Sequence, residues 1–303
     1  MIYPDFISPG ALVGLVAPAS KISEHYIAIT EKYLAGIGMR CIKGDSVVGQ
    51  WNQFGGTDQQ RADDLNSMIL NPEVDVIWCM RGGYGSVRIL DLVNFEVLKK
   101  NPKWLVGFSD ITVFHSMLQN KLNIASVHGP MPKNLDKTPY CDTGMDQLWD
   151  FLQGNYPIYD INSHPLNRCG KCSGQLIGGN LTILSMLKGS DIDFDPRGKI
   201  LFIEEVGEKL YHLDRLLQSL KIAGKLEGLE GLVVGQMTDM IDNDTPYGLT
   251  EYQIIAKAVE AYNFPVLFGF PSGHGYCNMP ILMGQTVEVD VSMEGVKFIY
   301  QKK

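Results

Sequence analysis

The serine at position 109 has the sequence setting of a catalytic nucleophile. The apolar residues 104–108 predict a buried strand, and a helix is expected to begin near Asp110. A serine at such a turn is exposed at the end of its strand, next to the N–H groups that a helix N-terminus leaves unbonded. Those groups suit the oxyanion of acyl transfer. Ile111 stands where the G-x-S-x-G elbow has its second glycine, so a helix N-cap is the alternative role for Ser109.

A serine nucleophile also needs a base, and the base needs an acid that orients it. Among the histidines, His128 and His274 lie in loops with glycine neighbours, where the backbone can turn tightly around an imidazole. The others lie in helical patterns or in an irregular segment: His25, His115, His164 and His212. Glu204 ends the apolar residues 200–203 and is the first carboxylate to emerge from that predicted strand. The chain order Ser109, Glu204, His274 is that of α/β-hydrolases, although each residue alone could be structural.

A glycine-rich loop at residues 81–86 follows another apolar run, residues 74–80. The loop matches neither G-x-G-x-x-G nor G-x-x-x-x-G-K-[ST], which argues against a nucleotide site. The backbone amides of Gly82 and Gly83 could instead face the same cleft as Ser109.

The elements that must position these residues alternate between strand and helix in the first half of the chain. Apolar runs at residues 11–17, 74–80, 104–108 and 123–127 alternate with helical patterns. This order predicts a parallel sheet with helices on both faces, a three-layer α/β domain whose active residues lie at the carboxyl ends of the strands. His115 is expected to point away from the N-terminal end of its helix.

The second half has a different sequence pattern. Strands are predicted at residues 199–203 and 229–234, and a helix with leucines along one face is predicted around residues 210–222. Residues 285–300 alternate like the strands of a smaller sheet. A proline-containing irregular segment precedes this half. We therefore predict an N-terminal domain over residues 1–140, a crossing over 141–170, and a smaller, strand-rich C-terminal α/β domain over 171–303.

Charge and composition exclude several classes of function. The 303 residues carry a net charge of −8 without a Lys/Arg-rich block, which argues against nucleic acid as a partner. Neither a secretory signal nor an apolar run long enough to cross a membrane is evident, so we expect a cytoplasmic protein. The scattered cysteines do not suggest a disulfide framework. Cys169 and Cys172 form one C-x-x-C, for which two reduced thiols in a turn and a zinc or redox site are the alternatives.

Several blocks taken together resemble the LD-carboxypeptidase family of serine peptidases, which includes the microcin C immunity peptidases. They occur in order between about residue 10 and residue 290, at residues 77–86, 106–110, 128–131, 178–181, 203–208 and 273–275. The resemblance implies Ser109 as nucleophile, His274 as general base and Glu204 as its orienting acid. It implies an oxyanion hole from the backbone N–H of Asp110 and of Gly82 or Gly83. It further implies an active site between two domains, a homodimer, and neither metal nor cofactor.

The activity implied is hydrolysis of the amide bond between an L-centre, lysine or diaminopimelate, and the C-terminal D-alanine of murein tetrapeptides during peptidoglycan recycling. We assign Arg81, His128 and Asn180, which lie in the matching blocks, to substrate binding. Arg81 is the candidate for the terminal carboxylate, with a structural salt bridge as its alternative role. Two other functions stay open: cleavage of an aminoacyl or peptidyl nucleotide amide, as in microcin immunity, and ligand binding without catalysis.

Overall fold

The computed structural model describes residues 1–136 and 142–301. The chain divides into two compact units, one made of Met1–Asn155 and Asn278–Met283 and the other of Tyr156–Cys277 and Gly284–Lys303. Cys141 and the predicted domain boundary at residues 140 and 141 lie outside the described residues. Within these residues no helix has the length and apolar character needed to cross a membrane.

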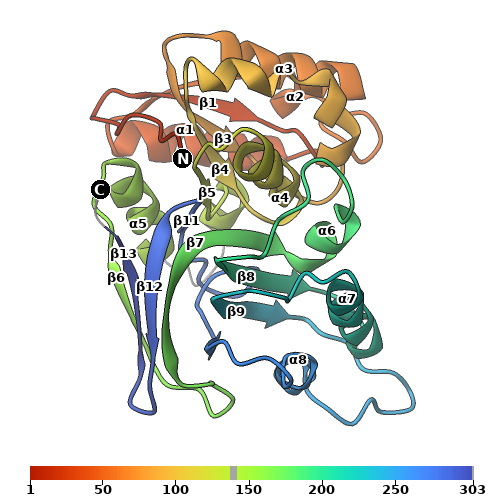
Figure 1. Cartoon of the computed structure of the whole chain (residues 1–303). Helices are drawn as coiled ribbons and strands as arrows, with labels where there is room; N and C mark the ends of the chain where they lie inside the picture. Colours follow the sequence, from red (N-terminus) through yellow and green to blue (C-terminus); the bar gives the residue numbers. More distant parts are fainter. Residues whose placement is uncertain (137–141, 302–303) are drawn as a thin grey trace. The chain divides into compact units, whose positions relative to one another are not determined.

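The first unit contains a six-stranded sheet that is parallel except at one edge (Figure 1). Its strands, in spatial order, are β11 (Ile281–Met283), β5 (Ser126–His128), β4 (Trp104–Gly107), β3 (Val74–Cys79), β1 (Leu12–Val16) and β2 (Arg40–Lys43). The inner strands are buried on both faces and therefore occur as continuous apolar runs in the sequence. The antiparallel edge strand β11 returns from a distant part of the chain, and the sequence does not predict it.

Helices cover both faces of this sheet. They are α1 (Glu24–Gly36), α2 (Asp45–Val48), α3 (Asp58–Leu70), α4 (Thr112–Ser116) and α5 (Asp142–Leu152), with the short 3₁₀ segments η1 (Ser86–Leu92), η2 (Phe95–Lys99), η3 (Ser109–Ile111) and η5 (Pro132–Asp136) and the π-turn η4 (Met117–Lys121). The chain runs from β1 outward to β2 and then back through β3, β4 and β5, so right-handed crossovers place α1 and α3 on opposite faces. The direction reverses between β1 and β3, which is where sheets of this kind bind ligands.

The second unit contains one seven-stranded sheet, half parallel and half antiparallel. Its strands, in spatial order, are β10 (Val266–Phe268), β9 (Gly231–Thr238), β8 (Lys199–Val206), β7 (Gly170–Asn180), β12 (Thr286–Val291), β13 (Val296–Tyr300) and β6 (Ile158–Ile161). Strands β7 to β10 are parallel, and β12, β13 and β6 extend this sheet with antiparallel strands. Residues 285–300, predicted to alternate like the strands of a smaller sheet, therefore belong to this seven-stranded sheet.

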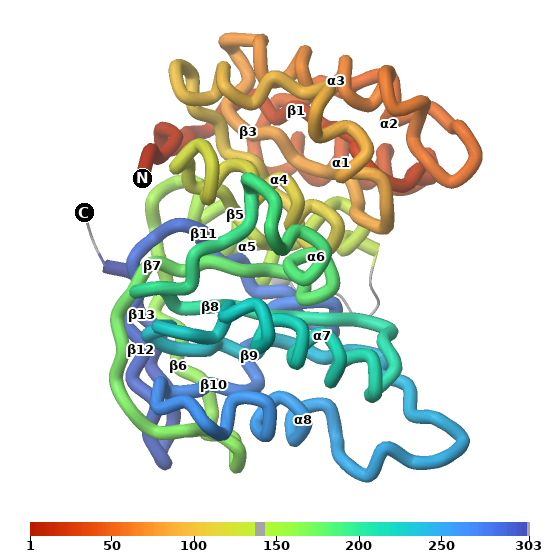
Figure 2. Tube along the Cα trace, turned by 45° about the vertical axis from the view of Figure 1, so that its right-hand side comes forward, coloured from red at the N-terminus to blue at the C-terminus, as the bar shows by residue number. Residues whose placement is uncertain are grey.

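The helices of the second unit pack on its parallel strands. They are α6 (Leu181–Met186), α7 (Leu210–Ile222) and α8 (Glu251–Ala258), and α7 and α8 lie beside β8 and β9 (Figures 1 and 2). The leucines of α7 belong to the buried core, as their helical spacing predicts. The predicted fold class, a mostly parallel N-terminal sheet followed by a strand-rich α/β unit, is confirmed.

Candidate active site

Ser109 lies at a strained turn between β4 and the helical segment that follows. Its backbone is in the left-handed region, with a φ of 65°. This conformation is rare for a residue with a side chain and costs roughly 1–3 kcal/mol, so the surrounding structure must maintain it. Ser109 is the first residue of η3, and the flanking cap position belongs to Phe108. The arrangement is the strand, sharp turn and helix of a nucleophile elbow.

The glycine loop after β3 lies directly against this elbow. A Cβ atom on Gly82 would lie 3.0 Å from the Ser109 Cβ and 3.3 Å from the Asp110 nitrogen, so a side chain at this position would crowd both. Gly83 has a φ of 110°, a conformation that residues with side chains rarely adopt. Within the first unit the structure thus brings Gly82 against Ser109 and Asp110, and Gly83 is the next residue of the same loop. These residues can supply a nucleophile and backbone donors for an oxyanion.

A buried histidine, His115, contacts the end of β4 just before the elbow. His115 is completely buried, with Nε2 2.9 Å from the Gly107 carbonyl oxygen and Nδ1 2.8 Å from Ser126 Oγ. Because a carbonyl only accepts hydrogen bonds, Nε2 donates to Gly107 and Nδ1 accepts from the Ser126 hydroxyl. The ring thereby connects the last residue of β4 to β5. His115 is not available as the catalytic base, because both ring nitrogens are used in this contact.

Burial lowers the pKa of His115 to about 4. The unfolded chain, with a histidine pKa near 6.5, therefore binds a proton more readily than the folded protein between these values. Stability from this residue is complete above pH 6.5 and is lost as the pH falls toward 4. As the pH falls from 6.5 to 4, we expect protonation of His115 to lower the free energy of unfolding by about 3 kcal/mol. The variant His115→Gln should lack this contribution to the pH dependence of stability.

Urea unfolding at several pH values, followed by tryptophan fluorescence, measures this effect. The fluorescence reports on the first unit, which contains every tryptophan of the chain: Trp51, Trp78, Trp104 and Trp149. His25→Gln removes an exposed imidazole from the same unit and is the control. If the wild type and His115→Gln lose stability equally between pH 6.5 and 4, the assignment is wrong.

The second unit contains an acid–base pair in which the acid is completely buried and the base is partly exposed. Glu204, near the end of β8, is completely buried, and its Oε2 lies 2.6 Å from His274 Nδ1. The pairing of β8 with β9 shifts register between Ile203 and Glu205, an irregularity of the kind that re-aims side chains near active sites. Because a carboxylate accepts, Nδ1 carries the proton and Nε2 is the nitrogen that can act as a base. Glu204 Oε1 has no hydrogen-bond partner among the described residues, so the contact with His274 is made through Oε2 alone.

The glycines on both sides of His274 allow this close contact. A Cβ atom on Gly273, which has a φ of 133°, would lie 3.1 Å from Glu204 Oε2. The Gly275 N–H donates to Gln236 Oε1 at 2.7 Å, and a Cβ there would lie 2.5 Å from the Gln236 side chain. Gln236 on β9 therefore fixes the loop that carries His274. The sequence alone does not single out this glutamine.

The predicted substrate-binding residues have different surroundings. Asn180 caps α6 through its Oδ1 and donates from Nδ2 to Glu205 at 2.9 Å, which is a structural role. His128 is buried in β5 with its ring against Phe108, at a centroid distance of 5.8 Å. Substrate contact by Asn180 and His128 stays a prediction.

Arg81 lies in the glycine loop, where its Nη1 donates to the Lys21 carbonyl at 3.1 Å. Among the described residues it has no ion-pair partner, and its Nε is buried without a hydrogen bond. Burial and the positive charge of Arg81 lower the pKa of Lys133. The salt bridge considered as an alternative role for Arg81 is therefore not found in the part of the chain that the structure describes.

The cysteines differ from expectation at one position. Cys277 is disulfide-bonded, whereas the scatter of the cysteines in the sequence did not suggest a disulfide framework. Cys169 and Cys172 are free, and burial raises the pKa of Cys172 to about 11, which disfavours the thiolate that metal binding or redox chemistry needs. The described residues contain no group of three or more His, Cys, Asp or Glu side chains that could hold a metal ion.

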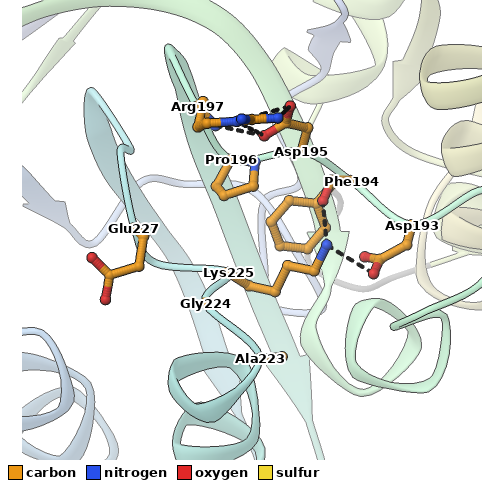
Figure 3. A pocket seen from close by; sticks show the side chains of 9 residues that line it. All are labelled: Asp193, Phe194, Asp195, Pro196, Arg197, Ala223, Gly224, Lys225 and Glu227. Atoms are coloured by element: carbon orange, nitrogen blue, oxygen red, sulfur yellow. Dashed lines mark hydrogen bonds and ion pairs between the residues drawn. The ribbon is translucent and has the colours of Figure 1, made fainter.

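A surface pocket of the second unit is not part of this chemistry. It lies where β8 begins, whereas Glu204 lies near the end of that strand. Lys225 contacts the Phe194 carbonyl and the Asp193 carboxylate at 2.6 and 2.8 Å, and Arg197 pairs with Asp195 (Figure 3). These charged groups neutralise one another, and the pocket presents no nucleophile.

The fold and these two clusters, a serine at a strained turn and a Glu–His pair, contain the residue types of the serine-hydrolase class. Residues 13–129 match the model of the LD-carboxypeptidase N-terminal domain, and residues 173–289 match that of the C-terminal domain. The chain therefore belongs to the LD-carboxypeptidase family of serine peptidases. The resemblance inferred from the sequence blocks is confirmed.

Three relatives illustrate the family. The chain is 30% identical to a probable murein peptide carboxypeptidase of Bacillus subtilis, covering 89% of this chain and 86% of the relative. It is 29% identical to the murein tetrapeptide carboxypeptidase of Pseudomonas aeruginosa, covering 92% of each. The microcin C7 self-immunity protein MccF of Escherichia coli is 22% identical over 94% of this chain and 91% of MccF. A solved MccF structure, covering 100% of this chain and 99% of its own, has a TM-score of 0.89 at 20% identity.

Proposed function

We propose that the protein is a serine carboxypeptidase that releases the C-terminal D-alanine of murein tetrapeptides from the preceding L-centre, lysine or diaminopimelate. The observation that carries this proposal is the 2.6 Å contact between the buried Glu204 and His274, the residues that the sequence resemblance implies as acid and base. The strained Ser109, with the glycine loop against it, supports the same reaction. The names of the relatives from Bacillus subtilis and Pseudomonas aeruginosa support murein peptides as the substrate class.

In the proposed reaction, His274 Nε2 takes the proton of Ser109 as Oγ attacks the scissile carbonyl. Glu204 holds Nδ1–H and stabilises the imidazolium that forms. The backbone N–H groups of Asp110 and Gly83 receive the oxyanion. The imidazolium then protonates the amine of D-alanine, which leaves. Water, deprotonated by His274, hydrolyses the acyl-enzyme and restores Ser109.

Release of free D-alanine from L-Ala-γ-D-Glu-L-Lys-D-Ala, and from its diaminopimelate counterpart, tests the proposal. The same peptide ending in L-alanine is the matched control and should not be cleaved. Binding of the D-alanine peptide by calorimetry without release would favour a ligand-binding protein. Cleavage of an aminoacyl nucleotide amide, with no D-alanine released, would favour the activity suggested by the relationship to MccF. Location in the cytoplasm, expected from the sequence, and a homodimer, implied by the family resemblance, stay predictions.

Arg81 is proposed to bind the terminal carboxylate of the substrate, because its guanidinium has no ion-pair partner among the described residues. Loss of one charged hydrogen bond is worth roughly 1.5–3 kcal/mol. We therefore expect Arg81→Gln to raise KM by about 10- to 100-fold with little change in kcat. Steady-state kinetics with the tetrapeptide and with its C-terminal amide measure the effect.

The wild type should prefer the free carboxylate, and Arg81→Gln should lose that preference. Arg88→Gln is the matched control, because Arg88 lies close by in sequence but is already paired with Asp58 at 2.6 Å. If Arg81→Gln still discriminates against the amide as strongly as the wild type does, Arg81 does not bind the carboxylate.

A further inference from the structure

A single peptide group in the glycine loop is held from both sides by buried charged side chains. The group joins Gly85 to Ser86, two residues after Gly83. Its N–H donates to Asp110 Oδ2 at 2.8 Å, and its carbonyl oxygen accepts from Arg61 Nη1 at 3.0 Å. Both bonds orient the same peptide plane, so together they fix the end of the loop, where it enters η1.

Asp110 is well suited to this contact. Its side chain is only 2% exposed, and a buried carboxylate is unfavourable unless hydrogen bonds compensate for lost water. Burial raises the pKa of Asp110, and the Ser86 hydrogen bond opposes that rise. Asp110 directly follows Ser109, so its bond to Ser86 links the elbow after β4 to the loop after β3.

Arg61, on helix α3, holds the other side of the Gly85–Ser86 peptide. It is completely buried, donates from Nε to the Gly56 carbonyl at 3.2 Å, and also bonds to the Pro18 carbonyl and to Asp58. Its guanidinium lies 4.8 Å from the centre of the Phe54 ring. Gly85 has a φ of 139°, and a Cβ there would lie 2.8 Å from Arg61 Nη1, so the loop approaches the guanidinium closely. The sequence signal for Arg61 is its helical spacing with the buried Leu65.

We propose that Asp110 and Arg61 are positioning residues that clamp the Gly85–Ser86 peptide and so hold the Gly83 N–H in place for the oxyanion. This inference rests on the proposed function. A loop with three glycines in four residues has many accessible conformations and loses much entropy when it is ordered. Oxyanion stabilisation depends on donors that are already in place, so the clamp acts on the transition state and not on substrate binding.

The test compares Asp110→Ala with Asp110→Asn, which keeps a hydrogen-bond acceptor. We expect Asp110→Ala to lower kcat by about 10²-fold with KM within about threefold, and Asp110→Asn to recover most of the loss. The affinity for a tetrapeptide boronic acid, which forms a tetrahedral adduct with the serine, should fall in parallel with kcat. Asp64→Ala is the matched control, because Asp64 is another buried carboxylate of this unit that accepts backbone N–H bonds, from Asp45 and Ser46. It should lower stability and leave kcat unchanged.

Hydrogen exchange of the amides in residues 81–88 provides a readout that does not require activity. Exchange should become faster in Asp110→Ala and Arg61→Lys, and stay as in the wild type in Asp64→Ala. If the wild type releases no D-alanine, the proposed function fails, while the exchange rates still decide whether the clamp exists. If Asp110→Ala keeps wild-type exchange and a kcat within twofold, the clamp is wrong. If Asp110→Ala does not fold, Arg61→Lys decides the test: boronate affinity and kcat must fall in parallel at constant KM, and if neither falls the clamp is wrong.

Discussion

Ser109→Ala is expected to lower the rate of D-alanine release by roughly 10⁴-fold or more, because the variant lacks the oxygen that forms the acyl-enzyme. Binding of the tetrapeptide should persist, since the substitution removes one hydroxyl and keeps the backbone conformation. Single-turnover kinetics measure the release, and calorimetry measures the binding. Mass spectrometry of the wild type, quenched during turnover, should reveal an adduct on the peptide that contains residue 109, and the variant should show none.

Ser116→Ala is the control for this experiment. Ser116 is a buried serine of α4 in the same unit, outside the proposed machinery. Ser116→Ala likewise removes one serine hydroxyl, from a neighbouring helix. We expect this variant to retain activity within about twofold. Release of D-alanine by Ser109→Ala at a rate near that of the wild type would show that another group is the nucleophile.

Glu204→Gln is expected to lower kcat by roughly 10³-fold although it preserves the shape of the side chain. A glutamine cannot stabilise the imidazolium by charge, and its amide can donate to Nδ1 and so favour the wrong tautomer of His274. The folded state should not suffer, because Glu204 is a buried carboxylate with one oxygen unbonded among the described residues. We therefore expect inactivity together with stability equal to or above that of the wild type, measured by kinetics and by urea unfolding.

The adjacent glutamate provides the control. Glu205 is also buried, but its carboxylate accepts from Asn180 at 2.9 Å and from the Thr182 N–H at 2.7 Å, so it holds the start of α6. Glu205→Gln should lower stability and retain activity within a few-fold. The opposite pattern, an active Glu204→Gln and an inactive Glu205→Gln, would exchange the roles assigned to the two carboxylates.

Local sequence determined several features that the structure contains. Thr57 and Gln60 predict a capping box, and both of its hydrogen bonds are present at the start of α3. The apolar runs of β1, β3 and β4 predict strands buried on both faces, and the leucine spacing of α7 predicts a core helix. Each of these depends on contacts or periodicities within a few residues, which a single sequence displays directly. The family resemblance likewise follows from short blocks.

The tertiary structure alone decided how segments far apart in the sequence meet. The return of β11 beside β5, the burial of His115 between Gly107 and Ser126, and the register shift at Glu204 depend on strand pairing that periodicity does not specify. The clamp on the Gly85–Ser86 peptide joins residues from three elements. Periodicity identifies which side chains are buried, whereas the partner of each buried polar group is set by the packing of the whole unit. Thus Asp110, read from the sequence as a backbone donor, gained a role for its side chain only in the folded structure.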